Sequence, residues 1–205
     1  MKLYYSPGAC SFAPHLALHE AGVAADAVKV DLRSHKTADG ADYYAVNPKG
    51  YVPFLVLDDG TTLSEAHVIL QYIADRKPGT IAPAYGTFER YKVNEWLGFV
   101  ATEIHKSYSP LWHADEFGEK AVDALKKKLH KRYEIVEAQL AKSPYLAGNT
   151  YSIADMYLFT VTNWAHHLKV DLSAFPKVQA WHKKIAERPA VAATQAVERG
   201  VKQAA

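Results

Sequence analysis

The sequence predicts a small α/β domain followed by a larger domain built only of helices. Strand and helix signals alternate over the first third of the 205 residues, and beyond about residue 88 the strand signals vanish. The stretch between the two regions holds four turn-forming residues, Pro78, Gly79, Pro83 and Gly86. We therefore expect an α/β domain over residues 1–77, a linker over 78–87 and an all-helical domain over 88–205.

The composition is that of an ordinary globular protein with a sizeable core. Hydrophobic residues make up 49% of the chain and charged residues 22%, and the formal net charge is +2. This charge is too small to indicate nucleic acid or an anionic membrane as a partner. No apolar run could span a bilayer, and Met1 leads directly into an expected strand, so we expect no signal peptide. A single cysteine excludes an internal disulfide and favours a reducing cytoplasm.

The N-terminal region reads as a strand–helix–strand unit. Lys2 to Tyr5 is the first expected strand, and Pro7-Gly8 a turn. Because proline is tolerated only in the first turn of a helix, Pro14 places the helix start near Cys10 or Ser11. Gly22 is the expected C-cap, and Ala27 to Val30 the second strand.

A polar stretch, Asp31 to Gly40, precedes a short helical piece near Tyr43. The expected hairpin that follows has strands at Phe54 to Leu57 and Thr61 to Leu63, with the turn at Asp59-Gly60. Ser64 is the predicted N-cap of the next helix. The first domain thus has the order βαβ, short helix, ββα.

In the second region, helical periodicity and helix-start signals dominate. A long helix is indicated by apolar residues at three- and four-residue spacing, Val122, Leu125, Leu129, Tyr133, Val136 and Leu140. Its lysine-rich face is interpreted as solvated, given the near-neutral charge. Ser152 with Asp155 matches a capping box, and Pro176 and Pro189 are expected to begin later helices.

Cys10 is the first candidate for chemistry. At a helix N-terminus, unpaired N–H groups and the helix dipole favour an anion and lower the pKa of a thiol. The motif reads Cys-Ser-Phe-Ala, so the second thiol of a C-x-x-C motif is absent, and any disulfide must form with an outside thiol. A buried structural cysteine is the alternative.

Four stretches, "YYSPGACS", "NPKGYVP", "TLSEAHVILQYIAD" and "EWLGFVATEIHKSYSPL", together resemble the glutathione transferases of the bacterial beta class. The resemblance covers essentially the whole chain. It implies a thioredoxin-like N-terminal domain that binds glutathione, and a helical-bundle C-terminal domain with the pocket for the acceptor substrate.

The resemblance also implies glutathione contacts in the first domain. Val52 would pair its backbone with the cysteinyl unit, before a cis bond to Pro53. The helix start at Ser64, Glu65 and Ala66 would hold the γ-glutamyl carboxylate, with Glu65 taking the α-amino group. The other expected contacts are Ser11, His35 or Lys36, and Glu103. Capping, loop and surface roles remain the alternatives for these residues.

The resemblance places His105 near the thiol as a second catalytic residue, although a core histidine is the alternative. Acceptor-pocket candidates are Tyr5, Tyr108, Trp112 and Trp164, with aromatic core as the alternative for each. Gly98 stands where relatives usually have Asn, so one ligand contact is expected to be missing. His15 and His19 have the spacing of a metal pair but lack a third ligand, so we expect a polar helix face and no metal.

The implied function is a cytoplasmic, homodimeric detoxification enzyme with glutathione as co-substrate. It would conjugate glutathione to apolar electrophiles, the reaction of class EC 2.5.1.18, or carry out glutathione-dependent thiol–disulfide exchange at Cys10. A glutathione-binding protein that sequesters apolar ligands with little turnover is the alternative.

Overall fold

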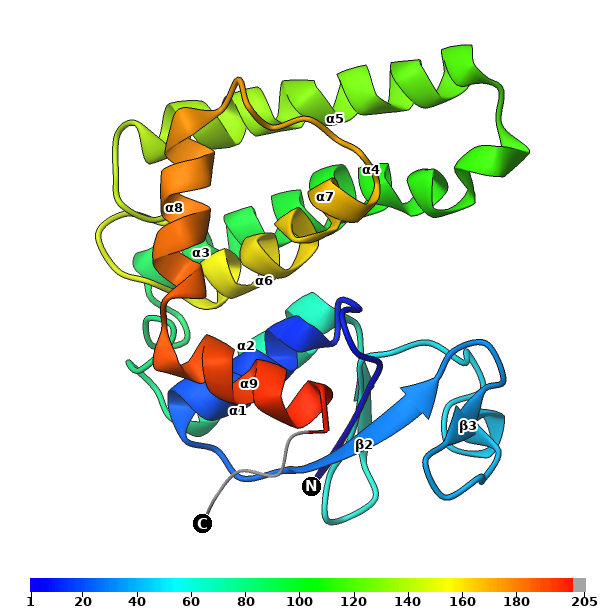
Figure 1. Cartoon of the computed structure of the whole chain (residues 1–205). Coiled ribbons are helices and arrows are strands. Elements are labelled where there is room, and N and C mark those ends of the chain that lie inside the picture. Colours follow the sequence, from blue (N-terminus) through cyan, green and yellow to red (C-terminus); the bar gives the residue numbers. More distant parts are fainter. Residues whose placement is uncertain (201–205) are drawn as a thin grey trace. The chain divides into compact units, whose positions relative to one another are not determined.

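The computed structural model describes residues 1–200, which form two compact units (Figure 1). One unit contains Met1–Ala82 and the segment that begins at Arg188, and the other contains Pro83–Glu187. The α/β and all-helical classes are confirmed, because the described strands all lie in the first unit. The predicted second domain, 88–205, differs from this division because the last helix packs with the first unit.

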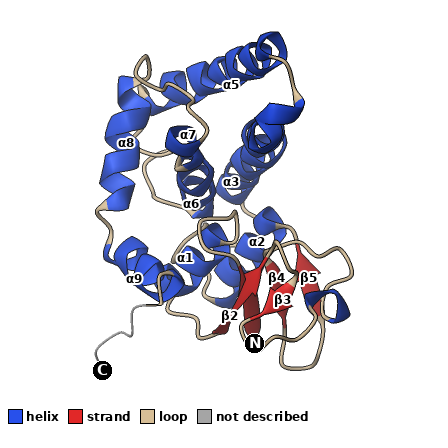
Figure 2. Cartoon of the chain, turned by 45° about the vertical axis from the view of Figure 1, so that its right-hand side comes forward, coloured by secondary structure: helices blue, strands red, loops and turns tan. Residues whose placement is uncertain are grey.

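The first unit is organised around a five-stranded sheet, shown in red in Figure 2, with the order β3-β2-β1-β4-β5. Its strands are β1 Lys2–Tyr5, β2 Asp26–Asp31, β3 Lys36–Thr37, β4 Phe54–Val56 and β5 Thr62–Ser64. The pair β1–β2 is parallel, and the other three pairs are antiparallel. The predicted βαβ unit and hairpin are therefore confirmed.

Helix α1, Phe12–Ala21, is buried along most of its length. Gly22 ends it with a φ of +59°, and the N–H of Val23 donates to the carbonyl of Leu18 at 3.0 Å, as in a Schellman motif. The apolar residues of α1 are not confined to one stripe because α2, Ala66–Arg76, and α9, Pro189–Glu198, both pack against it.

One expectation about the first unit was wrong, and one strand was not predicted. Ser64 does not cap α2; it ends β5, and Glu65 takes the N-cap position with a φ of +71°. The polar stretch after β2 contains β3, in which Thr37 pairs with Val30. A strand of two polar residues leaves no apolar alternation, so its partner strand alone defines it.

The second unit begins with α3, Phe88–Phe99, which continues through a π-helical turn at Val100–His105 into α4, Lys106–Tyr108. A 3-10 segment, Ser109–Glu116, follows, and the remaining helices are α5 Glu119–Leu140, α6 Ile153–Thr162, α7 Trp164–His167 and α8 Pro176–Ala186. The predicted periodicity of α5 is confirmed, because Leu129, Tyr133, Val136 and Leu140 are buried. So is the capping box of α6.

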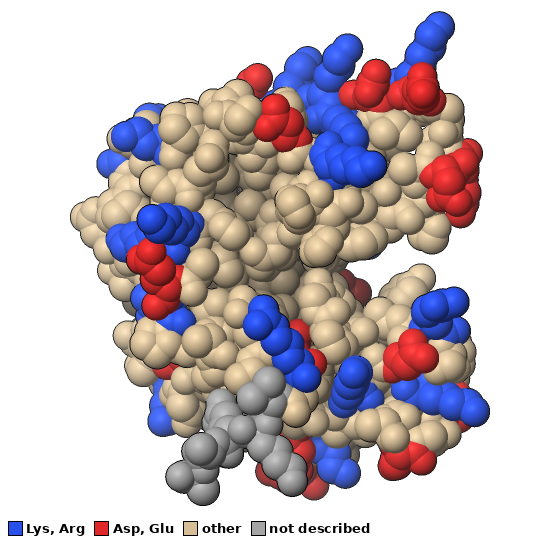
Figure 3. Space-filling view, in the orientation of Figure 1, with Lys and Arg blue, Asp and Glu red and all other residues tan. Residues whose placement is uncertain are grey.

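The outer surface of α5 carries both signs of charge. Figure 3 shows Lys and Arg side chains beside Asp and Glu side chains over this helix. This agrees with a solvated helix face. Within residues 1–200, no helix combines the length and apolar composition needed to cross a membrane.

Candidate active site

Cys10 lies in the turn between β1 and α1, half-buried, with Ser11 next to it as the N-cap residue of α1. Its Sγ donates to the carbonyl oxygen of Val52 at 3.3 Å. The first turn of α1 contains no acidic residue. The thiol therefore lies beside the positive end of a helix dipole.

The segment opposite Cys10 is held rigidly. The Val52–Pro53 bond is cis, as predicted. The carbonyl of the preceding residue, Tyr51, accepts hydrogen bonds from the hydroxyl of Tyr43 and the amide of Asn47, each at 2.8 Å. Among the described residues, no side chain or neighbouring strand accepts from the Val52 N–H. The Val52 backbone thus presents a donor and an acceptor beside the thiol.

The start of α2 presents further free donors. The N–H groups of Ala66 and His67 lie in the first turn, where no intrahelical partner exists. Glu65 is exposed, and its φ of +71° is unusual for a residue other than glycine. Such strain is found where the surroundings enforce it, often at ligand sites.

Sequence reasoning did not single out Lys49. Its ammonium lies 3.4 Å from the hydroxyl of Ser64, directly before the strained Glu65. It therefore adds positive charge to the start of α2. The stretch "NPKGYVP" contains this lysine, but its contact with Ser64 across 15 residues leaves no signal in the sequence.

His35 is packed into the loop before Val52. Its ring lies 4.4 Å from the ring of Tyr44, and its buried Nδ1 has no partner in the described chain. Gly50 is required behind it, because a Cβ there would approach Tyr44 Cε1 to 2.6 Å and His35 Nδ1 to 3.0 Å. Lys36 is exposed on β3. Both residues therefore stay candidates for binding a carboxylate.

The Ser11 side chain has an internal structural role. It is fully buried, its hydroxyl accepts from the Ser6 N–H at 3.1 Å, and it also donates to the Ser6 carbonyl. A direct contact of this hydroxyl with glutathione does not agree with that placement.

In the second unit, His105 ends the π-helical turn and lies against two aromatic rings. Its Nδ1 is 2.6 Å from the hydroxyl of Tyr157, and its ring centroid is 5.0 Å from that of Trp164. Burial, and secondarily the charge of Lys106, lowers the pKa of His105 to about 4. The imidazole is therefore neutral at pH 7. Glu103, two residues earlier in the same π-helical turn, is bound by Arg132 at 2.7 Å.

The four predicted acceptor-pocket residues differ in exposure. Trp112 is 49% exposed and contacts the nearly buried Trp164, with ring centroids 5.8 Å apart. Tyr108 is fully buried and hydrogen-bonded to Tyr133 at 2.9 Å, which suits the core alternative. Tyr5 is also buried, and burial raises its pKa, with a further contribution from Glu198. Tyr5 therefore keeps its proton at neutral pH.

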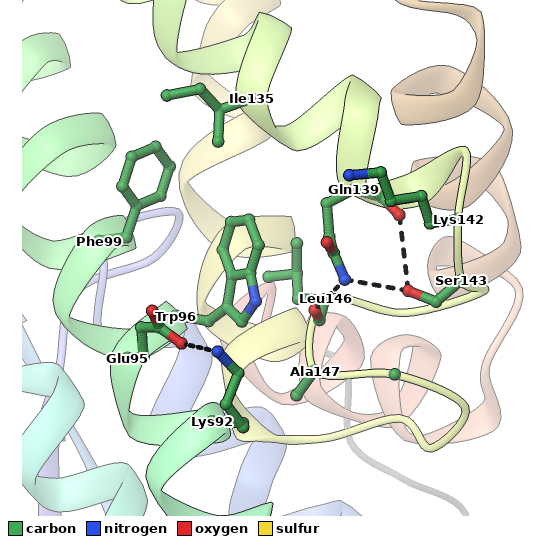
Figure 4. Close-up of a pocket in the computed structure, with 11 residues that line it drawn as sticks. Lys92, Glu95, Trp96, Phe99, Ile135, Gln139, Lys142, Ser143, Leu146 and Ala147 are labelled. Atoms are coloured by element: carbon green, nitrogen blue, oxygen red, sulfur yellow. Dashed lines mark hydrogen bonds and ion pairs between the residues drawn. The ribbon is translucent and has the colours of Figure 1, made fainter.

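A separate cavity of about 500 Å³ lies within the helical unit. Figure 4 shows Trp96 and Phe99 of α3 on one side and Ile135 and Gln139 of α5 on another. None of the predicted site residues lines it. The described residues contain no cluster of His, Cys, Asp and Glu side chains that could hold a metal ion.

The first unit has a thioredoxin-like fold with a half-buried thiol at a helix start, and the second unit is all-helical. This combination is the one expected of a glutathione transferase. Domain models of the glutathione S-transferase N-terminal and C-terminal domains match residues 8–76 and 99–189. Glutathione S-transferase GstA of Escherichia coli O157:H7 is 43% identical over 93% of this chain and 95% of its own.

Solved structures give the same assignment. A sphingomonad glutathione S-transferase complexed with glutathione is 43% identical, with a TM-score of 0.92 over 97% of this chain and 99% of its own. The bacterial beta-class glutathione S-transferase of Sphingomonas chungbukensis is also 43% identical, with a TM-score of 0.91 over 98% and 100%. The chain belongs to the glutathione S-transferase family, and within it to the bacterial beta-class type.

Proposed function

We propose that this protein is a glutathione transferase that binds glutathione in its first unit. The observation that carries the proposal is the contact of the Cys10 thiol with the Val52 carbonyl, 3.3 Å away, beside a Val52 N–H that takes no part in the sheet. An extended tripeptide with a central cysteine can pair with this backbone as an added strand. Its own thiol then lies next to Cys10.

The ends of glutathione carry charges that match the rest of the site. The γ-glutamyl carboxylate would sit on the free N–H groups at the start of α2, near Lys49. Exposed Glu65 would receive the α-amino group. His35 or Lys36 would bind the glycyl carboxylate, with the ring of His35 held against Tyr44.

Two reactions are possible in this site, one at the thiol of glutathione and one at the thiol of Cys10. In conjugation, the glutathione thiolate attacks an apolar electrophile bound by aromatic residues such as Trp112, and the leaving group departs. In exchange, the Cys10 thiolate attacks a glutathionylated disulfide, the other thiol leaves, and a second glutathione releases oxidised glutathione from Cys10. Neutral His105 suits hydrogen bonding to sulfur or proton transfer in either reaction.

The test has two parts. The intact mass of the purified protein, before and after reductant, shows whether a glutathione adduct forms at Cys10. Turnover of an activated aryl halide and of a glutathionylated disulfide is then compared in wild type and Cys10→Ser. Loss of exchange alone assigns Cys10 to exchange, whereas absence of both activities in the wild type contradicts the proposal.

We also propose a cytoplasmic homodimer as the working form. The single free cysteine fits a reducing compartment. Several large apolar side chains are widely exposed in the single chain, including Phe88 at 74% and Tyr91 at 61%, both on α3. Exposed aromatic clusters are typical of protein interfaces. Sedimentation at micromolar concentration should give twice the chain mass of 22.7 kDa.

A further inference from the structure

The buried carboxylate of Glu198 joins two elements of the first unit. We propose that Glu198 is a positioning residue that fixes the turn carrying Cys10. The inference rests on the proposed function only in assigning a task to Cys10. Glu198 ends α9 and is 6% exposed, although it lies almost 190 residues from the thiol along the chain.

Each oxygen of this carboxylate has its own partner. Oε2 accepts from the backbone N–H of Gly8 at 3.1 Å, and Oε1 lies 3.1 Å from Nδ1 of His15. His15 is 4% exposed, so the expected polar helix face at this residue was wrong. One carboxylate therefore connects the turn before Cys10 to the middle of α1.

The contact between Glu198 and the turn is made at a glycine. Gly8 has a φ of +74°, and glycine has more conformational freedom to lose than any other residue. Two further bonds in the turn are local, from the N–H of Ala9 to the carbonyl of Ser6 and from the N–H of Ser6 to the Ser11 hydroxyl, each at 3.1 Å. Glu198 ties Gly8 to a helix from the far end of the chain.

Helix α9 is itself firmly held, so it can serve as an anchor. At its other end Arg188 makes a two-point ion pair with Glu20, one bond of which is 2.8 Å long. Arg188, at the start of α9, contacts Glu20 near the end of α1, whereas Glu198, at the end of α9, contacts His15 in the first half of α1. Helix α9 therefore runs antiparallel to α1 (Figures 1 and 2). We call the contacts of Glu198 with Gly8 and His15 the inner clamp of α9, and the Arg188–Glu20 ion pair its outer clamp. The Tyr5 ring, 5.1 Å from His15, packs beside the inner clamp.

These two clamps provide a matched comparison. Glu198→Ala removes the clamp that touches the turn, and Arg188→Gln removes the one that does not. Glu198→Gln keeps an oxygen that can accept from the Gly8 N–H. Three quantities are measured on the full chain: amide exchange at Gly8 by NMR, the pH midpoint of Cys10 alkylation, and glutathione affinity.

We expect Glu198→Ala to speed exchange at Gly8 by about tenfold or more relative to Arg188→Gln at matched global stability. Glutathione affinity should fall by roughly threefold to tenfold, and the alkylation midpoint should move toward the free-thiol value of about 8.5. Glu198→Gln should restore the Gly8 exchange rate.

Equal exchange rates at Gly8 in Glu198→Ala and Arg188→Gln would overturn the proposal, since both would then act only through stability. So would faster exchange with an unchanged alkylation midpoint and rate, because the turn would not position the thiol. If the wild type binds no glutathione, the proposed function fails, while Gly8 exchange and Cys10 alkylation still decide the role of Glu198.

Discussion

Glu65 combines three residue-level features that a simple surface glutamate would not need. It has a φ of +71°, it precedes the free donors of α2, and it follows a serine contacted by the ammonium of Lys49. A strained backbone at a non-glycine residue costs about 1–3 kcal/mol. Strain of this size is kept where function or dense packing requires it, and the side chain is exposed.

Glu65→Ala is expected to weaken glutathione binding by about ten- to hundredfold, because a charge-assisted bond of roughly 1.5–3 kcal/mol is lost. Calorimetric titration of the variant with glutathione measures this. Glu65→Gln, which keeps the shape without the charge, should weaken glutathione binding more than binding of an analogue that lacks the α-amino group. Unchanged affinity with a lowered melting temperature would mean that Glu65 serves only the helix start.

The buried imidazole of His105 should make the folded protein sensitive to acid. Its pKa is lowered to about 4 in the folded state, against 6.5 for the ordinary side chain. Between these values the unfolded chain binds more protons, so stability falls as pH falls through this window. The contribution between pH 7 and pH 5 is roughly 1–2 kcal/mol.

His105→Gln, which cannot titrate, should therefore lose less stability than wild type when the pH is lowered from 7 to 5. Urea unfolding at both pH values and one protein concentration gives the comparison. Tyr157→Phe is the control, because it removes the 2.6 Å bond to Nδ1 but keeps the titrating ring. Equal pH dependence in wild type and His105→Gln would show that another group causes the acid sensitivity.

At the scale of elements, the capping box of α6 is a local structure on which the stability of the helical unit depends. The fully buried carboxylate of Asp155 accepts from the N–H groups of Leu146 and Ser152, the Ser152 hydroxyl and the Trp181 indole, at 3.0 to 3.2 Å. The carboxylate thus joins α6 to α8 and to the loop that precedes α6. Burial raises the pKa of Asp155 to about 6, while these bonds oppose the rise.

Asp155→Ala should destabilise the protein by about 3–5 kcal/mol, since it leaves several buried donors unpaired. Ser152→Ala should cost only about 1 kcal/mol, the usual value of a lost N-cap. Chemical unfolding of both variants tests the difference. Asp123→Ala, on the exposed side of α5, is the matched control and should change stability by less than about 0.5 kcal/mol.

Elements whose signals are local were predictable from the sequence. Gly22, the capping box at Ser152 and the prolines at 176 and 189 each mark a helix end by a steric or hydrogen-bonding rule that needs only neighbouring residues. Ser64 was assigned wrongly because a serine directly before a helix can be either the N-cap of that helix or the last residue of the preceding strand. In the structure Ser64 pairs with Phe54 of β4, the other strand of the hairpin, and therefore ends β5.

The candidate site divides along the same line. Cys10, the cis Val52–Pro53 bond and the start of α2 were located from local motifs and the family resemblance. The Ser6–Ser11 bonds, the Lys49 contact and the Glu198 clamp depend on side chains meeting across the fold. The last of these spans 190 residues and has no periodicity or spacing that a sequence can display.

At the scale of the whole molecule, the chain returns to its first unit at the end. Residues 188–200 group with Met1–Ala82, although they follow the helical unit in sequence. The reason is physical, because α9 buries Val191 and Thr194 and makes side-chain contacts with α1 at both of its ends, Glu198 with His15 and Arg188 with Glu20. The first unit therefore cannot be completed until the last helix is present.

A chain that ends at Glu187 should accordingly lose stability in the first unit. Without α9, the face of α1 that it covers is exposed and Glu20 and His15 lose their side-chain partners, so backbone amides of α1 and β1 should exchange much faster. Amides of α5 and α6 should keep most of their protection. Hydrogen exchange with mass spectrometry measures both units in one sample, and a chain that ends at Gly200 controls for loss of the last residues. The opposite pattern, with protection lost in α5 and α6 and kept in α1, would support the sequence-based boundary that assigns residues 88–205 to one domain.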